Sequence, residues 1–327
     1  MSESSTTTDA ASTLVTGTLA SPADKLRAMM SAGVVGMPGA FNGLAARLAK
    51  HAGFEGLYVS GAAVTASFGV PDVGMLTLNE FCNVIYQVAR ATGYGTASAL
   101  PIIADADTGF GEAEMVRRVV HEYHRAGAAG FHIEDQVFPK RCGHLDGKAL
   151  VAVDHFTEKV AAAAAARDSL TAGGVSNTGT AGRGPFVVCA RTDAAGVSGV
   201  DDTIARSKAY LDAGADMIFP EGLRTEDDFG RVAQAVKEHD AGAFLLANMT
   251  EFGKTPIIPL ARFGELGYDA VIWPVSSLRS AMGEAQRLFA ALREDGTVER
   301  VMDRMLTRAE LYESLGYTPG EEWRFGG

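Results

Sequence analysis

Two aspartates separated by one residue are the first candidates for chemistry in this sequence. Asp105 and Asp107 lie at the end of the apolar run PIIADAD. On an extended strand, alternate side chains point to the same side about 6–7 Å apart, so we expect both carboxylates on one face. Such a pair suits Mg²⁺, with Mn²⁺ as an alternative, because these ions prefer oxygen ligands. Loop-capping aspartates are the competing interpretation. Glu134, two positions after His132, is a further candidate catalytic residue, which would accept hydrogen bonds next to the metal ligands without touching the metal.

A cysteine flanked by cations is the second candidate. Cys142 lies in the segment KRCGH, residues 140–144, and two cations and an imidazole beside a thiol favour the thiolate. Two glycines would let this loop open and close over a substrate. A zinc site is disfavoured because no second cysteine pair exists. The other thiols, Cys82 and Cys189, are expected to be buried in a helix and a strand, so the odd cysteine count indicates no disulfide scaffold.

Polar residues also follow almost every β-type run of the chain. Capping explains some of them, but not a ring of polar groups at the strand ends. Arginine can pair with a carboxylate through two hydrogen bonds, which makes Arg191, Arg279 and Arg308 candidates for anion binding. A solvated helix face is the alternative for Arg308. A divalent metal, several arginines and a mobile cysteine together indicate an enzyme for a small polycarboxylate.

Eight short β-type runs alternate with helix-like stretches, and Ala-Gly turns join several helices to the next strand. Strands alternating with helices predict right-handed βαβ units, and eight even units favour a closed (β/α)8 TIM-type barrel over an open doubly wound sheet. The runs begin at Gly33, Gly56, Pro101, Gly130, Phe186, Met217, Phe244 and Ala270. Two helical stretches, about Leu278–Glu294 and Val298–Ser314, follow the last run, which is one helix more than a barrel needs.

Composition and charge narrow the class of protein. The 327 residues carry a formal net charge of −11, which disfavours nucleic-acid binding. No apolar run reaches the length of about 20 residues that spans a membrane. No Lys or Arg precedes Lys25, so we expect no targeting signal and a cytoplasmic location. We expect residues 1–20 to form a flexible tail, residues 21–327 a single barrel domain, and the Gly-rich segment 171–184 a surface insertion without an assigned role.

Several long motifs resemble the isocitrate lyase/phosphoenolpyruvate mutase superfamily, and within it the methylisocitrate lyase family. The resemblance runs from about residue 25 to 317, and KRCGH and NMTEFGKTP are its most specific motifs. It also covers YVSGAAVTASFGVPDVGMLT, ADADTGFG, ARTDA, FPEG, VIWPVSSLRSAM and TRAELYES.

This resemblance implies a barrel whose last helix is exchanged between subunits, usually in a homotetramer. It implies a Mg²⁺-dependent cleavage of 2-methylisocitrate into pyruvate and succinate, in the methylcitrate route of propionate catabolism. Sister lyases acting on dimethylmalate or isocitrate, and an oxaloacetate-type decarboxylase, remain open. A catalytically silent barrel is a further alternative, against which the joint presence of Cys142, Asp105 and Arg191 argues.

Residue roles follow from the same resemblance. It implies that Asp105 and Asp107 hold the metal, that Cys142 is the catalytic acid with His144 in the same closing loop, and that Tyr58 is a base or a base relay. The residues matching substrate-binding positions are Ser60, Gly61, Ala62, Cys142, Gly143, Arg191, Glu221, Asn248, Met249, Thr250, Arg279 and Arg308. It also places Phe219 and Ile272 nearest to the extra methyl group of the substrate, with simple barrel core as the alternative for both.

Overall fold

Eight short, apolar strands form the centre of the molecule. The structure is a computed structural model that describes residues 20–141, 143, 147–170, 184–253 and 255–323. Cys142, His144, nearly all of the Gly-rich segment and nearly all of the expected tail therefore lie outside the described residues. The strands are β1 (Val35–Pro38), β2 (Leu57–Val59), β3 (Ile102–Asp105), β4 (Gly130–Glu134), β5 (Val187–Thr192), β6 (Met217–Pro220), β7 (Phe244–Asn248) and β8 (Ala270–Trp273). All eight predicted strands are confirmed.

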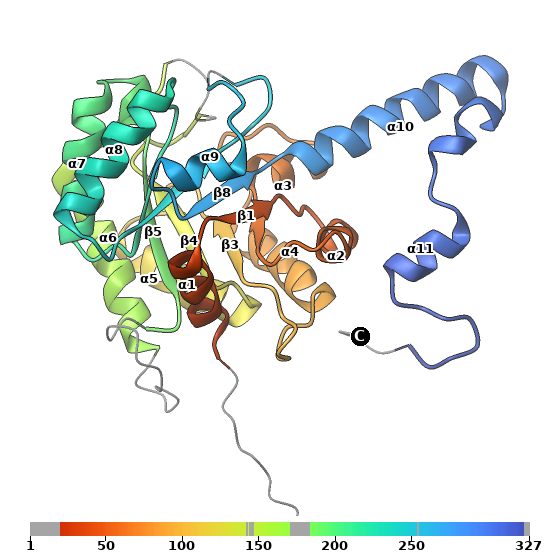
Figure 1. The fold of residues 1–327 in the computed structure, drawn as a ribbon, viewed down its shortest axis with the longest axis horizontal. Helices are drawn as coiled ribbons and strands as arrows, with labels where there is room; N and C mark the ends of the chain where they lie inside the picture. The colour runs from red at the N-terminus through yellow and green to blue at the C-terminus, as the bar shows by residue number, and fades with distance from the viewer. Residues whose placement is uncertain (1–19, 142, 144–146, 171–183, 254, 324–327) are drawn as a thin grey trace, which may run out of the picture.

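The strands pair in parallel in the order β1-β8-β7-β6-β5-β4-β3-β2. β1 and β2 meet through a parallel bridge between Gly39 and Tyr58, where the N–H of Ala40 donates to the carbonyl of Tyr58 over 2.8 Å. This contact brings the two edges of the sheet together into a nearly closed barrel (Figure 1). The predicted TIM-type barrel is confirmed, and the doubly wound sheet is excluded.

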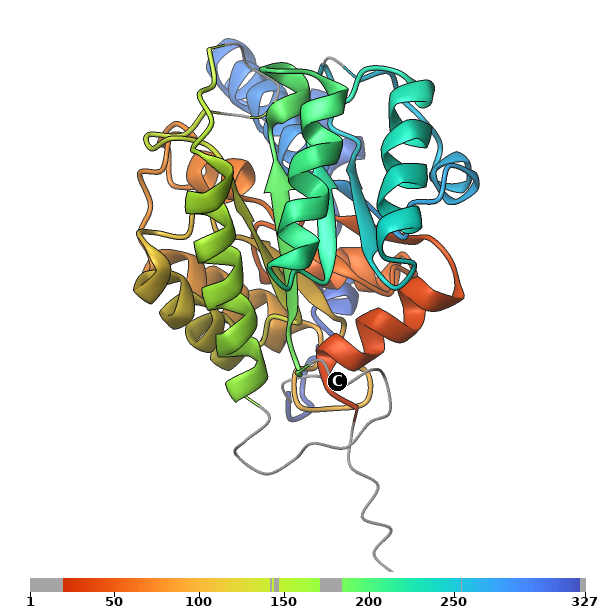
Figure 2. The same ribbon diagram turned by 90° about the vertical axis from the view of Figure 1, so that its left-hand side faces the viewer.

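Helices between the strands cover the outside of the barrel, as Figure 2 shows for α6, α7 and α8. Side-chain caps define several of their first turns: Thr77 and Glu80 form a capping box, as do Thr225 and Asp228. The helices are α1 (Pro22–Ala32), α2 (Gly43–His51), α3 (Gly61–Ser67), α4 (Leu78–Ala91), α5 (Ala113–Ala126), α6 (Val153–Ser169), α7 (Val200–Asp212), α8 (Glu226–His239), α9 (Leu260–Glu265), α10 (Ser276–Asp295) and α11 (Arg308–Ser314).

The prediction of one helix over Val298–Ser314 is wrong. A 3-10 helix over Glu299–Arg304 ends at Met305, whose backbone is extended. A new capping box between Thr307 and Glu310 then begins α11. The local hydrogen bonds of Thr307 therefore restart the helix where the apolar pattern alone appeared continuous. The short helices α1 and α3 were not predicted.

Two apolar layers hold the barrel. One lies between the strands and the surrounding helices, and the other fills the barrel interior. Leu26 and Met30 of α1 pack into the interior layer, so α1 closes the end of the barrel opposite the carboxyl ends of the strands. Arg27 fixes α1 there by donating to the carbonyls of Gly184 and Phe186 over 3.0 and 2.8 Å. The carboxyl ends of the strands, where active sites of this fold lie, are at the other end of the barrel.

The long helix α10 leaves the barrel instead of packing on it (Figure 1). Of its 20 residues only Leu278 and Ala291 are buried, while Met282, Phe289 and Leu292 are exposed. These apolar side chains lie in water, where their exposure is unfavourable. Among the described residues, no helix is long and apolar enough to cross a membrane.

Candidate active site

A cavity of 230 Å³ opens at the carboxyl ends of the strands. Residues from β2 through β8 and from the loops after them contribute to its wall, as expected for an active site in this fold. The lining residues are Tyr58, Ser60, Ala62, Asp72, Asp105, Lys140, Gly143, Arg191, Phe219, Glu221, Asn248, Thr250, Glu251, Phe252, Gly253, Ile272, Pro274, Val275 and Arg279.

The two predicted metal carboxylates lie together, but not for the predicted reason. β3 ends at Asp105, and Asp107 follows in a left-handed conformation with φ 46°, so strand alternation does not orient it. The backbone N–H of Asp107 instead folds back to donate to Oδ1 of Asp105 over 2.9 Å. A Cβ built on Gly61 would lie 2.6 Å from Oδ2 of Asp105 and 3.4 Å from Oδ1 of Asp107. Gly61 therefore allows both carboxylates to approach the beginning of α3.

Buried charges surround this pair. Nζ of Lys140 lies 2.7 Å from Oδ1 of Asp107 and also contacts the carboxylate of Asp72. Burial raises the pKa of Asp107 to about 6 despite this ammonium group. Burial also acts to raise the pKa of Asp105, but His132 and Lys140 outweigh it and hold that pKa below its usual value. The two carboxylates are therefore electrostatically distinct, and a cation already contacts one of them.

Arg191 is held between two acids at the end of β5. Its Nε lies 2.9 Å from Oδ2 of Asp193, and its Nη1 lies 2.9 Å from Oε2 of Glu134. Burial raises the pKa of Glu134 well above its usual range, and its Oε1 has no hydrogen-bond partner among the described residues. The guanidinium also lies 5.3 Å from the ring centre of Phe219. These contacts fix the orientation of Arg191 before any ligand binds.

Tyr58 pairs with a buried histidine. Its hydroxyl oxygen lies 2.6 Å from Nε2 of His132, which in turn is 3.7 Å from Oδ1 of Asp105. Burial lowers the pKa of His132 to about 4 and raises the pKa of Tyr58 well above its usual value. Both groups are therefore neutral near pH 7. This argues against a free phenolate base and is compatible with a proton relay.

The far wall of the cavity comes from the strand ends β6 to β8. The side-chain amide of Asn248 donates to both carboxylate oxygens of Glu221, over 3.3 and 3.2 Å. Arg279 donates to the carbonyl and carboxylate of Glu251 over 2.8 and 2.9 Å, and to Thr250 over 3.4 Å. Its side chain is 46% exposed, so this arginine retains access to a ligand in the cavity.

The backbone of Gly143 reaches the same cavity. A Cβ built there would lie 2.5 Å from both Nη2 of Arg191 and Cγ of Glu221, so only glycine fits without displacing them. Lys148 contacts the carbonyl oxygen of Gly143, and its Nζ lies 2.7 Å from Oδ1 of Asp193. Lys148 thus ties this part of the chain to the acid that also orients Arg191.

Most predicted site residues line the cavity, with a few exceptions. Asp107 and Glu134 are not among the lining residues, but they contact Asp105 and Arg191, which are. Gly61 contributes its N–H, which donates to Oδ2 of Asp105 over 3.0 Å. Met249 is buried, and its sulfur accepts from the N–H of Ile258, so it packs in the core. Arg308 is exposed at the beginning of α11 and is not among the residues that line the cavity. Cys142 and His144 lie outside the described residues.

Asp72 and Lys148 are additional candidates that motif spacing did not single out. Asp72 pairs with Lys140 across 68 residues of sequence, and Lys148 pairs with Asp193 across 45. No pattern along the chain encodes such contacts. Their sequence signal was limited to their position: Asp72 lies in the loop after α3, and Lys148 lies in the loop after β4, near the KRCGH motif.

The donor set fits a divalent cation. Four acidic and three basic side chains line the cavity, so its wall carries an excess of negative charge when all are ionised. A polycarboxylate ligand would add to this charge unless a cation accompanies it. The described residues hold no group of three or more His, Cys, Asp or Glu arranged as a metal site. Asp105 and Asp107 would therefore bind a cation that retains waters or takes ligand oxygens, as Mg²⁺ does. The unpartnered oxygen of Glu134 is a buried acceptor close by.

Comparisons with known proteins agree with this fold. Residues 26–293 match the phosphoenolpyruvate phosphomutase family. The probable 2-methylisocitrate lyase 1 of Corynebacterium glutamicum is 50% identical over 282 residues, which cover 86% of this chain and 84% of the relative.

Solved structures give the same result. A 2,3-dimethylmalate lyase of the PEP mutase/isocitrate lyase superfamily has a TM-score of 0.79 and 36% identity, covering 90% of this chain and 92% of that one. A phosphonopyruvate hydrolase solved with oxalate and Mg²⁺ has a TM-score of 0.74 and 31% identity, covering 90% and 95%.

A TIM-type barrel with paired carboxylates and arginines at its carboxyl end is typical of an enzyme, and the most similar of the relatives named above are lyases. The chain belongs to the isocitrate lyase/phosphoenolpyruvate mutase superfamily.

Proposed function

We propose that this protein is a metal-dependent carbon–carbon lyase that cleaves 2-methylisocitrate into pyruvate and succinate. The observation that carries the proposal is the convergence of Asp105 and Arg191 at one cavity, with Asp107 hydrogen-bonded to Asp105, in a chain half identical to a probable 2-methylisocitrate lyase. Cleavage of 2,3-dimethylmalate is the second candidate, because a lyase with that substrate has the same fold over nearly the whole chain.

Mg²⁺ is the proposed metal, with Mn²⁺ as a substitute. Asp105 and Asp107 would hold it, and Glu134 would act as a neighbouring acceptor. When bound, such an ion polarises a hydroxyl group of the substrate and lowers its pKa. The solved phosphonopyruvate hydrolase with oxalate and Mg²⁺ supports this choice of metal.

The side chains of the cavity would bind and orient the substrate. Arg191 is fixed by Asp193 and Glu134, so its guanidinium can receive a carboxylate with little loss of conformational freedom. Arg279 would bind a second carboxylate at the more open side of the cavity. Negative charge that develops during C–C cleavage would then lie near preorganised donors, which lowers the barrier.

Two protons need to move in this reaction. Tyr58 and His132 are positioned to relay the proton of the substrate hydroxyl, because they are hydrogen-bonded to each other and both neutral near pH 7. Cys142 would protonate the carbon released as succinate, as its motif KRCGH implies. For that step the cysteine has to arrive as a thiol, since a general acid must carry its proton.

A small apolar area of the cavity would accept the extra methyl group. Phe219 and Ile272 line the cavity, and each is 1% exposed. Burying one methyl group in such an area discriminates by about 1–3 kcal/mol, or roughly 10- to 200-fold in kcat/KM.

The test is a substrate panel with Mg²⁺. Pyruvate release from 2-methylisocitrate, glyoxylate release from isocitrate and cleavage of 2,3-dimethylmalate are measured separately as kcat/KM. We expect 2-methylisocitrate to exceed isocitrate at least tenfold on packing grounds. A ratio near or below one contradicts the proposed substrate, and faster cleavage of dimethylmalate would establish the second candidate.

We also propose a cytoplasmic homotetramer in which α10 packs on a neighbouring subunit. The exposed Met282, Phe289 and Leu292 support this, because they lie along a helix that leaves its own barrel. Light scattering tests it: the parent should have the mass of four chains, and Phe289→Glu should reduce that mass. A monomeric parent would refute it.

A further inference from the structure

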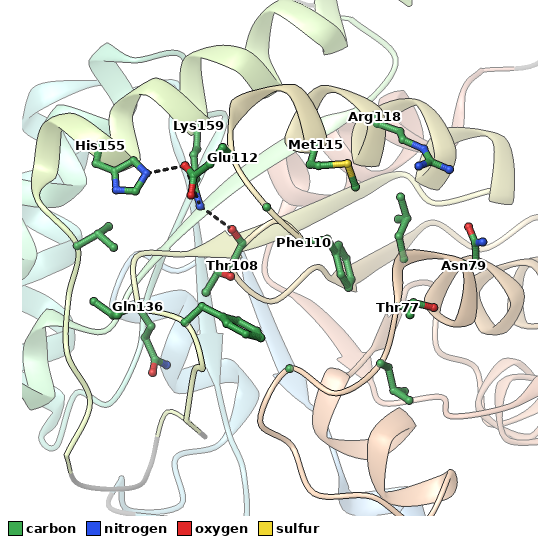
Figure 3. Close-up of a pocket in the computed structure, with 17 residues that line it drawn as sticks. Thr77, Asn79, Thr108, Phe110, Glu112, Met115, Arg118, Gln136, His155 and Lys159 are labelled. Carbon is green, nitrogen blue, oxygen red and sulfur yellow. Dashed lines mark hydrogen bonds and ion pairs between the residues drawn. The ribbon is translucent and has the colours of Figure 1, made fainter.

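A second and larger cavity lies outside the site described above. It has a volume of 750 Å³ and shares no lining residue with the smaller cavity. Leu76, Phe110, Met115 and Phe138 provide an apolar wall. Figure 3 shows that polar groups occupy its two ends: His155, Glu112 and Lys159 at one, Arg118 and Asn79 at the other, with Phe110 between them. An apolar centre with a few polar groups is typical of a small-molecule site.

Charge indicates which ligand this cavity would accept. Glu112 is the single acid among its lining residues, and it is already engaged: Nε2 of His155 lies 2.6 Å from its Oε2, and Nζ of Lys159 lies 3.7 Å from the same oxygen. Arg118 is the cation at the opposite end. Its ion pair in the described chain is a long one, 3.9 Å from Nε to Oε1 of Glu122, and its side chain is 55% exposed. Although the chain carries a net charge of −11, this cation would attract an anionic group locally.

Backbone strain also marks this cavity. Three non-glycine residues of the described chain adopt a left-handed conformation: Asp107, Phe252 and Phe110. Asp107 and Phe252 belong to the candidate active site. Phe110, with φ 56°, is a bulky aromatic residue for which this conformation is unfavourable, and its ring lines the larger cavity. Strained residues cluster where function requires a particular geometry, so Phe110 points to a function here too.

We propose that the larger cavity is a regulatory site for a small amphipathic anion with an aromatic or branched apolar body. The body would lie between Phe110, Met115 and Phe138, and the anionic group would bind Arg118 and Asn79.

The two cavities are connected through one pair of chain segments. Asp72 contacts Lys140 on the side of the active site. Two residues away on each segment, Gly74 and Phe138 touch on the side of the larger cavity, where a Cβ on Gly74 would lie 2.5 Å from the Phe138 ring. A ligand that packs against the Phe138 ring would press on both segments, and we expect it to weaken the contact between Asp72 and Lys140. We expect such a ligand to lower the activity, and substrate to weaken ligand binding by the same factor.

Two fluorescent probes with the same rings test the ligand class. 8-Anilinonaphthalene-1-sulfonate carries an anionic group, and N-phenyl-1-naphthylamine lacks it. Arg118→Gln should weaken binding of the sulfonate roughly 3- to 10-fold and change that of the neutral probe less than about twofold. Arg117→Gln is the matched control, because Arg117 pairs with Glu114 and does not line the cavity. Equal affinities of parent and Arg118→Gln for the sulfonate would overturn the proposed anion site.

Met115→Trp narrows the cavity at its apolar wall and should weaken binding of both probes, with circular dichroism showing that the variant is folded. Because Arg118 is exposed, Arg118→Gln keeps the test decisive if Met115→Trp does not fold. Saturating sulfonate should lower kcat/KM of the parent about threefold or more, and that of Arg118→Gln much less at the same concentration. Probe binding without any change in activity overturns the regulatory role. Failure of both probes to bind overturns the proposal. If the oligomer mass of Arg118→Gln then also differs from that of the parent, the cavity belongs to a subunit interface.

Discussion

Replacing Gly61 with alanine is expected to weaken metal binding while the barrel stays folded. Gly61 is the first residue of α3, and its N–H donates to Oδ2 of Asp105. An added Cβ would lie 2.6 Å from that oxygen, where ordinary contacts begin at 3.4 Å. The carboxylate is buried and already bonded to the N–H of Asp107, so it has little room to move without leaving its position.

The size of the effect follows from this overlap. Relieving it moves the Asp105 oxygen by about 0.8 Å, whereas metal–ligand distances tolerate only about 0.2 Å. Disturbing the groups that orient a ligand typically costs 10- to 100-fold in metal affinity, so we expect Mn²⁺ to bind about 10- to 100-fold more weakly. Gly61 does not have a positive φ, so alanine suits its helical backbone and the variant should stay folded with a moderately lower melting temperature.

Electron paramagnetic resonance of free Mn²⁺ measures this affinity without relying on turnover. The parent, Gly61→Ala and the control Ser67→Ala are titrated side by side. Ser67 is on the same helix, and its hydroxyl donates to the carbonyl of Val64 rather than to the carboxylates. A folded Gly61→Ala variant that binds Mn²⁺ as tightly as the parent would refute the geometry inferred for the metal site.

Four further predictions concern activity. Exhaustive EDTA treatment should abolish turnover, and Mg²⁺ or Mn²⁺ should restore it; full activity of the chelated enzyme would remove the metal from the mechanism. Cys142→Ser should lower kcat by orders of magnitude with KM little changed, because a hydroxyl is a weaker acid than a thiol; near-normal kcat excludes the proton-donor role. Lys148→Met should lower kcat/KM about tenfold, because Lys148 links the Gly143 carbonyl to the Asp193 carboxylate. Lys148→Arg should recover part of this loss, and unchanged kinetics in both variants would show that the contact is dispensable. Phe219→Trp should shift the preference toward isocitrate by roughly tenfold, and a lower melting temperature with an unchanged preference would identify Phe219 as barrel core alone.

The barrel was predictable because its signals are local. Each strand is a short apolar run, and the turns before several strands contain Ala-Gly. Since parallel strands direct their carboxyl ends to one side, the convergence of Asp105 and Arg191 followed from the order of the elements.

Features that depend on distant contacts were not predictable. The amphipathic pattern of α10 predicts a helix, but it does not say on which barrel the helix packs. The pairing of Lys140 with Asp72 requires two loops to meet across 68 residues. The orientation of Asp107 was wrongly derived from strand alternation, because the strand ends two residues before it and the chain turns left-handed there.

The left-handed backbone of Asp107 implies a trade-off between folding and activity at this position. This conformation costs most non-glycine residues about 1–2 kcal/mol and aspartate less, and burial next to Asp105 adds an electrostatic cost that is visible in its pKa of about 6. A chain selected only for thermal stability would therefore replace Asp107, for instance with asparagine, which tolerates the same backbone without the charge. A divalent cation bound at the proposed site would offset this cost, since a ligand that binds only the folded state raises its stability. The melting temperature, measured against cation concentration, would then report how strongly the two carboxylates hold the ion.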